Sequence, residues 1–194
     1  MSEIIIHRVN KIKYLKKINK KYGVEIDIRS KNSNLILNHE PYQNGDNLHN
    51  YLENFDHGTI ILNVKESGIE NDVKKLMKNY KIKSYFFLDI EIPFIFNSLK
   101  KKFKKIAVRF SEHEPIEMAK ILQNKIDWIW IDTVNKLPIN HNNIKIINKF
   151  KSCLVCPERW GRKKDIIKYK NKMLKMNFSP DAIMTDLKFA KLWK

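Results

Sequence analysis

Short apolar runs of strand length alternate with amphipathic helical patterns along the whole chain, and this alternation limits the fold more than any other feature. Strands that alternate with helices pair in parallel as βαβ units, and eight such strands predict a closed barrel. We therefore predict the α/β class and a compact (β/α)8 TIM-type barrel. The expected barrel strands are residues 4–9, 24–29, 59–65, 85–90, 106–110, 128–133, 153–156 and 182–185. The expected helices are residues 11–22, 48–55, 69–80, 93–103, 115–124, 142–150 and 163–176, followed by a short helical tail.

Turn and cap residues add detail to this pattern. A turn at residues 32–34 and a further strand at 35–39 predict a hairpin after the second barrel strand. Gly23 is expected to end the first helix, and Asp46 to cap the second. An open doubly wound sheet is the structural alternative. The sequence has no Gly-rich phosphate loop after the first strand, which weakens a nucleotide-binding interpretation of that alternative.

The length of 194 residues predicts a single domain over residues 1–194. Barrels of this type typically have about 250 residues, so the loops must be tight. The N-terminus has no basic segment followed by an apolar one, and no run approaches the roughly 18 apolar residues of a membrane span. We expect a cytoplasmic protein without a transmembrane segment.

The formal net charge of +17 comes almost entirely from lysine. Such a charge is typical of proteins that bind nucleic acid, anionic membranes or phosphorylated substrates. Compositional drift is the alternative, since Lys, Asn and Ile are abundant together and Arg is scarce. We favour drift, because the Lys runs lack the Arg and interleaved aromatic residues that nucleic-acid grooves use. We therefore expect no specific nucleic-acid partner, and only a weak association with anionic surfaces.

The two cysteines, Cys153 and Cys156, form a C-x-x-C motif that zinc sites and redox enzymes both use. A zinc site would need a second pair of ligands, and the sequence has no second Cys pair. A redox motif normally opens a helix, whereas this pair lies in an expected strand. We interpret both cysteines as small residues of a buried strand.

Polar residues gather where the first expected strands end, which is where a barrel carries its functional side chains. His7 and Arg8 end the first strand, Glu25 and Asp27 lie on the second, and His39 ends the hairpin strand. Residues two apart in a strand share a face, so Glu25 and Asp27 lie side by side. Two adjacent carboxylates repel each other unless a cation lies between them. A divalent cation with oxygen ligands, Mg or Ca, is the natural occupant.

The third strand and the two histidines extend this site. Asn63 could offer a neutral oxygen to the same metal, and Lys65 a fixed positive charge. Two histidines suit general acid–base catalysis on a phosphodiester: one deprotonates the nucleophile and the other protonates the leaving oxygen. Arg8, Lys65 and the metal would neutralise the phosphate. Arg109 is a candidate second phosphate contact, because its guanidinium offers a bidentate fork that lysine lacks.

The order His7-Arg8, then Glu25-Ile-Asp27, then a short strand that ends in His39, resembles the glycerophosphodiester phosphodiesterase family. More broadly, it is similar to the phospholipase-C-like phosphodiesterase superfamily of barrels. The family motifs are H-R-G, E-x-D on the next strand and H-D after a short strand. The resemblance implies that His7 and His39 form the acid–base pair and that Glu25 and Asp27 bind a magnesium or calcium ion. It is sharp over residues 3–65 and architectural beyond, apart from a similar closing strand at 182–186.

Several positions depart from the family pattern. Val9 replaces the glycine of H-R-G, and a Cβ there restricts how closely a phosphate approaches the backbone. Glu40 replaces the aspartate of H-D. The family places a carboxylate and a lysine on the third strand, where this chain has Asn63 and Lys65. The loss of that carboxylate should weaken divalent metal binding. The insertion after the second strand is very short, so a sugar or glycan phosphate is as plausible a substrate as a glycerophosphodiester, and a cyclic phosphate is as plausible a product.

Three functions follow from these residues. The first is a metal-assisted phosphoric diester hydrolase that acts on a small phosphodiester. The second is a catalytically degenerate barrel that binds a phosphorylated ligand. The third is a polyanion-binding protein that uses the Lys-rich helical regions at residues 11–21 and 99–105. Metal-dependent turnover separates the first from the second, and strongly salt-dependent binding to DNA or anionic vesicles would support the third.

Overall fold

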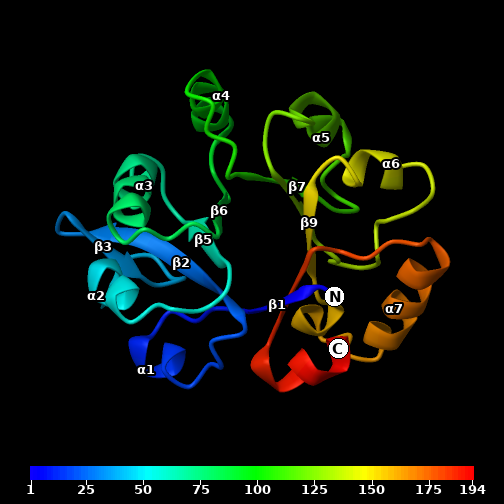
Figure 1. Cartoon of the computed structure of the whole chain (residues 1–194), viewed down its shortest axis with the longest axis horizontal. Helices are drawn as coiled ribbons and strands as arrows, with labels where there is room; N and C mark the ends of the chain where they lie inside the picture. Colours follow the sequence, from blue (N-terminus) through cyan, green and yellow to red (C-terminus); the bar gives the residue numbers. More distant parts are fainter. The chain divides into compact units, whose positions relative to one another are not determined.

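The computed structural model describes residues 1–194, which group into two compact units. The N-terminal unit comprises Ile5–Phe96, and the C-terminal unit comprises Met1–Ile4 with Asn97–Lys194. Each unit contains parallel strands and its own helices, and the N-terminal unit adds an antiparallel hairpin (Figure 1). The expectation of a single domain over the whole chain stays a prediction.

Strand β2 (Gly23–Lys31) organises the N-terminal unit. It pairs in parallel with β1 (Glu3–Ile6) at its start and with β5 (Ile60–Val64) along its length. Its far end pairs antiparallel with β3 (Asn34–Leu37). The remaining strands of this unit are β4 (Asp46–Asn47), which pairs with β3, and β6 (Tyr85–Leu88), which pairs in parallel with β5.

Four parallel strands form the sheet of the C-terminal unit, in the order β7, β8, β9, β10. Their bounds are β7 Ala107–Phe110, β8 Trp128–Ile131, β9 Lys151–Val155 and β10 Ala182–Thr185. The β10 bounds match the predicted strand, and the others differ from prediction by a few residues at their ends. Cys153 and Cys156 are buried and form no disulfide. The C-x-x-C pair therefore lies in and directly after a buried strand, as expected.

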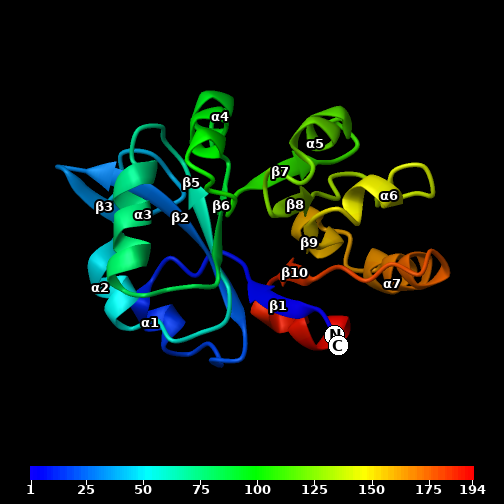
Figure 2. The same ribbon diagram turned by 45° about the horizontal axis from the view of Figure 1, so that its top comes forward.

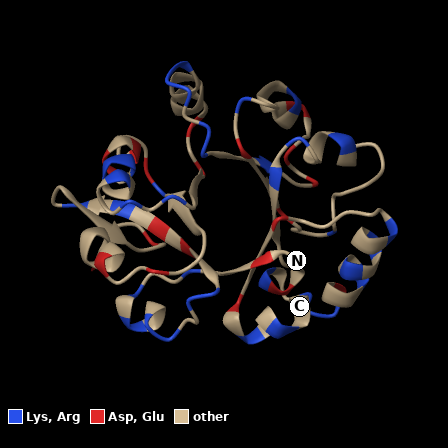
Figure 3. Ribbon diagram, viewed as in Figure 1, with Lys and Arg blue, Asp and Glu red and all other residues tan.

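The helices follow the strands, as the sequence pattern predicts. Their bounds are α1 Ile12–Leu15, α2 Leu48–Glu53, α3 Glu70–Asn79, α4 Ile92–Lys100, α5 Glu117–Leu122, α6 Ile144–Ile147 and α7 Asp165–Lys175, with the 3₁₀ helices η1 Pro157–Trp160 and η2 Leu187–Trp193. Helices α2 and α3 lie beside the β2–β3–β5 sheet in both ribbon views (Figures 1 and 2). Lysine and arginine colour much of the helical surface in both units (Figure 3). No helix has both the length and the hydrophobicity required to span a membrane.

Successive side chains of β2 alternate between an apolar face that belongs to the core and a face that carries the candidate site. Val24, Ile26 and Ile28 are fully buried apolar residues of one face, and Glu25 and Asp27 lie on the other. The predicted hairpin is confirmed. Its turn residues at 32 and 33 adopt positive φ angles of 48° and 63°, as the tight turn of a twisted hairpin requires.

Three local predictions are wrong. The helix expected over residues 11–22 forms only at Ile12–Leu15. Lysines three and four residues apart repel one another there, and the Asn19 side chain accepts the Lys21 N–H, which competes with helical hydrogen bonds. Gly23 therefore begins β2 instead of ending a helix. Asn47, and not Asp46, caps α2 by accepting the N–H groups of residues 49 and 50. Asp46 instead accepts the Ile12 N–H at 2.7 Å.

Candidate active site

The carboxylates of Glu25 and Asp27 form the centre of the candidate site. Both side chains are only 1% exposed, although they are acidic. Buried carboxylates are unfavourable unless they are paired or hydrogen-bonded, so their partners define the site. All the residues described next, apart from Arg109, belong to the N-terminal unit.

The turn after β1 places His7 and Arg8 next to Glu25. The Arg8 N–H donates to Glu25 Oε2 at 2.8 Å, and the Val9 N–H donates to the Glu25 carbonyl oxygen at 2.8 Å. Arg8 takes the left-handed conformation, with a φ of 51°, so the special backbone position is Arg8 and not Val9. Val9 is fully buried in the core. Its side chain thus packs in the place that the family motif gives to glycine, while its N–H still anchors the turn.

Asp27 is held by one neutral residue and approached by two cations. Asn10 Nδ2 donates to Asp27 Oδ2 at 2.8 Å, and the Asp27 N–H donates back to Asn10 Oδ1 at 2.8 Å. Arg8 Nε lies 3.9 Å from Asp27 Oδ2. Lys65 Nζ lies 3.3 Å from Asp27 Oδ1 and 3.5 Å from Asp89 Oδ2. The ammonium of Lys65, which follows β5, is therefore shared between a carboxylate on β2 and one that follows β6, the two strands that pair with β5.

Asn63 joins the cluster through its amide. It pairs with Asp27 in the β2–β5 register, and its Nδ2 donates to Glu25 Oε1 at 2.9 Å. Its Oδ1 atom is buried without a hydrogen-bond partner, and so is Asp27 Oδ1, although Lys65 is within ion-pair distance of the latter. Carboxylate and amide oxygens are ligands that Mg²⁺ and Ca²⁺ prefer, so Glu25, Asp27 and Asn63 fit a divalent cation. Nowhere in the chain do three or more His, Cys, Asp or Glu side chains form a group suited to a metal.

The proximity of the two acids changes the titration of Glu25. Burial, and next the negative charge of Asp27, raise the pKa of Glu25 from 4.5 to about 7. The hydrogen bonds from Asn63 and from the Arg8 N–H oppose this rise, as does the charge of Lys65. Each donor around Glu25 thus favours the carboxylate form against the cost of burying it.

His39 follows β3 and is tied to the same cluster through the backbone. The N–H of the preceding Asn38 donates to the Asp27 carbonyl oxygen at 3.1 Å. His39 Nδ1 lies 2.6 Å from Glu40 Oε1, and this hydrogen bond lowers the pKa of Glu40. A carboxylate can only accept, so Nδ1 carries the proton in this pair and Nε2 of a neutral ring keeps its lone pair.

Arg29 connects the His39 segment to the end of β5. Its Nε and Nη2 atoms donate to the His39 carbonyl oxygen at 3.2 and 3.0 Å, and its Nη1 donates to the Lys65 carbonyl oxygen at 3.2 Å. The planar guanidinium suits such a fork. Arg29 thus fixes the backbone of two predicted site residues.

Arg109 lies on β7, in the C-terminal unit. Its Nη1 atom is 3.4 Å from Asp132 Oδ2 and 3.8 Å from Glu114 Oε1. Hydrogen bonds and ion pairs therefore join Arg8, Glu25, Asp27, Asn63 and Lys65 directly. His7 lies in the same turn as Arg8, and His39 is tied to the cluster through the backbone. All seven residues belong to one unit, and Arg109 belongs to the other. A phosphate-binding role of Arg109 stays a prediction.

Sequence reasoning missed three residues of the cluster: Asn10, Arg29 and Tyr51. The Tyr51 hydroxyl is buried without a hydrogen-bond partner, and burial followed by the charges of Glu25 and Asp46 raises its pKa. Strand alternation could have found Arg29, because it has the same parity as Glu25 and Asp27. Asn10 and Tyr51 have no comparable signal, since one follows a turn and the other lies in a helix.

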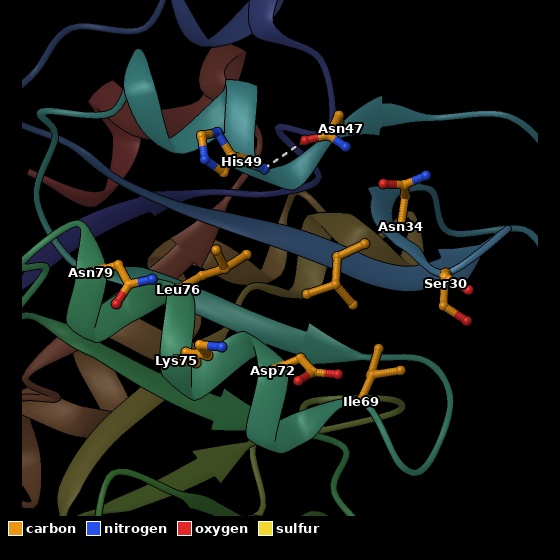
Figure 4. Close-up of a pocket in the computed structure, with 11 residues that line it drawn as sticks. Ser30, Asn34, Asn47, His49, Ile69, Asp72, Lys75, Leu76 and Asn79 are labelled. Carbon is orange, nitrogen blue, oxygen red and sulfur yellow. Dashed lines mark hydrogen bonds between the residues drawn. The ribbon is translucent and has the colours of Figure 1, made fainter.

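A separate groove of about 620 Å³ lies in the same unit, between the β2–β3 hairpin and helices α2 and α3 (Figure 4). Its lining includes Asn34, His49, Asp72 and Lys75. None of the predicted site residues lines it. Its walls carry no cluster of buried unpaired groups, so its size alone does not make it the candidate active site.

Comparisons with known proteins agree with the fold. No protein-family model matches the sequence, and no curated protein matches it. The structure matches the crystal structure of a glycerophosphodiester phosphodiesterase from Agrobacterium tumefaciens str. C58, with a TM-score of 0.70 and 12% sequence identity. The match covers 100% of this chain and 99% of that chain. The predicted fold class, α/β with a TIM-type barrel, is confirmed by this likeness. At this identity the likeness establishes the fold alone.

Proposed function

We propose that the chain is a metal-assisted phosphoric diester hydrolase. The observation that carries this proposal is the pair of buried carboxylates, Glu25 and Asp27, beside the His7–Arg8 turn. One oxygen of Asp27 and the amide oxygen of Asn63 are buried there and accept no hydrogen bond. Unpartnered buried oxygens are rare in proteins and call for an explanation. A bound ligand supplies one, and the fold is that of a phosphodiesterase.

Glu25, Asp27 and Asn63 would hold the divalent ion, Mg or Ca. When bound, this ion would polarise a phosphoryl oxygen as a Lewis acid. Arg8 and Lys65, both within ion-pair distance of Asp27, would supply positive charge for the phosphate. Arg109 remains a candidate for a further phosphate contact.

His39 and His7 would share the proton transfers. The hydrogen bond to Glu40 leaves Nε2 of His39 with a lone pair, so His39 is assigned as the base that takes a proton from the attacking water. The water oxygen forms a bond to phosphorus as the bond to the leaving oxygen breaks. His7 is assigned as the acid that protonates the leaving oxygen. In a substrate with a neighbouring hydroxyl, His39 would deprotonate that group instead, and the product would be a cyclic phosphate.

The substrate is proposed to be a small phosphodiester, either a glycerophosphodiester or a sugar or glycan phosphate. The first experiment is turnover on a panel of such diesters, with magnesium, calcium or a chelator. His7→Ala and Glu25→Ala are compared with His141→Ala, whose side chain is in an exposed turn. We expect chelator-sensitive turnover that both site variants lose and the control keeps.

A catalytically degenerate barrel that binds a phosphorylated ligand is the second candidate. The observation that favours it is that both oxygens of Glu25 already accept protein donors, while Lys65 lies beside Asp27. Isothermal titration with Mg²⁺ and with a phosphate ester distinguishes the two. No turnover on any diester, together with no divalent ion binding, would exclude the enzyme and leave the binding protein.

A further inference from the structure

The two buried carboxylates of the candidate site, Glu25 and Asp27, have two cations beside them. Lys65 and Arg8 lie 3.3 and 3.9 Å from Asp27, and Lys65 also lies 3.5 Å from the part-exposed carboxylate of Asp89. Asn63 adds no charge, and its amide nitrogen donates to Glu25. A carboxylate in the place of Asn63 would add a negative charge beside Glu25, and the site would then bind a divalent cation more strongly.

The same cluster nevertheless leaves ligand atoms unused. Asp27 Oδ1 and Asn63 Oδ1 belong to side chains that are 1% and 7% exposed, and neither accepts a hydrogen bond. Only one of these two atoms carries charge. The affinity of oxygen sites for divalent ions depends on the number of charged ligands, so these atoms alone give a weak site.

A phosphate group can supply the additional charged oxygen ligands that the protein lacks. Mg²⁺ is commonly bound by one or two carboxylates together with the phosphate oxygens of a substrate. A phosphate anion would also attract Lys65 and Arg8, which both lie within ion-pair distance of Asp27. The movement of those cations would expose more of the Asp27 carboxylate to the metal.

We propose that Asn63 makes metal binding conditional on phosphate, so that the free protein binds the cation weakly and holds the cation and a phosphate ester together as a pair. This inference rests on the metal ligands assigned in the proposed function, but not on turnover. Because binding linkage is reciprocal, the cation must strengthen phosphate binding by the same factor as phosphate strengthens cation binding.

The test is isothermal titration of the full chain with Mg²⁺, in the absence and presence of saturating glycerol 3-phosphate. For the wild type we expect the Mg²⁺ dissociation constant to fall by about tenfold or more when the phosphate ester is present. The reverse titration, phosphate ester into protein with saturating Mg²⁺, should yield the same factor. An Mg²⁺ affinity that does not depend on phosphate would overturn the proposal.

Two variants sharpen the test. Asn63→Asp should bind Mg²⁺ alone about tenfold more tightly than the wild type and depend less on phosphate, with the exposed Asn142→Asp as the charge-matched control. Lys65→Gln should also bind Mg²⁺ alone more tightly, because it removes the internal cation without adding a charge opposite Glu25. It keeps the proposal testable if Asn63→Asp fails to fold. Wild-type affinity in both variants would contradict the proposal.

Failure of this inference and failure of the proposed function are distinguishable. Phosphate-dependent Mg²⁺ binding without hydrolysis of any diester would support the inference and reject the hydrolase. Mg²⁺-dependent hydrolysis with equal Mg²⁺ affinity in the presence and absence of phosphate would do the opposite.

Discussion

Each unit contains a buried aspartate, Asp27 within β2 and Asp132 directly after β8, and the hydrogen bonds of the two differ. Asp132, at the end of β8, accepts hydrogen bonds on both oxygens: Thr133 N–H at 2.8 Å and Trp160 Nε1 at 3.0 Å on Oδ1, and Arg109 Nη1 at 3.4 Å on Oδ2. Asp27, on β2, has an Oδ1 atom that accepts none.

The groups around Asp132 and Asp27 also differ. Asp132 contacts a backbone N–H, an indole and a guanidinium, all donors, so its carboxylate is satisfied within the protein. Asp27 lies beside a second carboxylate, Glu25, whose pKa is raised to about 7. A buried acid with all its hydrogen bonds made stabilises a fold, whereas an adjacent pair of acids with a buried oxygen that accepts no hydrogen bond is typical of a functional site. The comparison therefore favours a structural role for Asp132 and supports the proposed chemical role of Glu25 and Asp27.

The largest expected effect comes from removing the base of the chemical site. His39→Ala should lower kcat on a hydrolysed diester by about 10²- to 10⁴-fold, the usual contribution of general base catalysis. Its fold should persist, because the residue's backbone carbonyl, which Arg29 holds, is retained. Steady-state kinetics beside His141→Ala measures the effect. A variant with wild-type kcat would remove His39 from the mechanism.

The next effect concerns pH and stability in the absence of metal. A folded-state pKa of about 7 for Glu25, against 4.5 in the unfolded chain, means that the folded protein binds more protons between these values. The contribution of Glu25 to the free energy of unfolding is therefore full below pH 4.5 and declines as the pH rises through 7, by about 3 kcal/mol. Glu25→Gln should remove this decline.

Urea denaturation in EDTA, at pH 5 and pH 8, measures the difference between wild type and Glu25→Gln. The glutamine can still accept the Arg8 N–H, and rotation of the Asn63 amide lets it donate to Asn63 Oδ1. The variant should therefore gain stability relative to the wild type at pH 8. Parallel pH profiles for the two proteins would show that Glu25 has no raised pKa.

How far the sequence predicts this site depends on the kind of interaction. Strand alternation placed Glu25 and Asp27 on one face, and β-branched runs located β2 and β10 well. Asn47 replaces Asp46 as the cap because Asp46 accepts the Ile12 N–H, a contact between segments distant in sequence. Strand alternation also places Arg29 on the face of Glu25 and Asp27, but its hydrogen-bond partners could not be predicted, because they are backbone carbonyls, which every residue carries.

A smaller effect is expected at the satisfied aspartate. Asp132→Asn keeps the side-chain shape but turns one oxygen into an amide donor that faces Arg109 or Trp160. The variant loses a charged acceptor, and the Arg109 or Trp160 donor then faces another donor. This change should lower the free energy of unfolding by about 2 kcal/mol. Urea denaturation measures the change, with the exposed Asn142→Asp as the control. Unchanged or increased stability would put Asp132 in the same class as Glu25 and break the comparison.

The smallest expected effect concerns Arg29, and it tests whether this residue acts by positioning His39 or by its positive charge. It also compares Arg29 with Arg109, an arginine of the other unit. Arg109 pairs with carboxylates, whereas Arg29 directs its described hydrogen bonds to the carbonyl oxygens of His39 and Lys65. Arg29→Lys preserves the positive charge, but a single ammonium cannot reproduce the fork that holds both carbonyls. We expect kcat to fall about tenfold because His39 is less well oriented, while KM changes little because the charge remains.

The matched control for that variant is Arg159→Lys, since Arg159 is exposed and its guanidinium lies 5.8 Å from the Trp160 ring centroid. It should retain wild-type kcat and KM. A contact that is made equally in the ground state and the transition state changes KM alone. A raised KM with unchanged kcat in Arg29→Lys would therefore mean that Arg29 attracts the phosphate instead of positioning His39. Wild-type values for both constants would show that the hydrogen bonds of β2 and β3 suffice to place His39, and that the site needs no arginine fork.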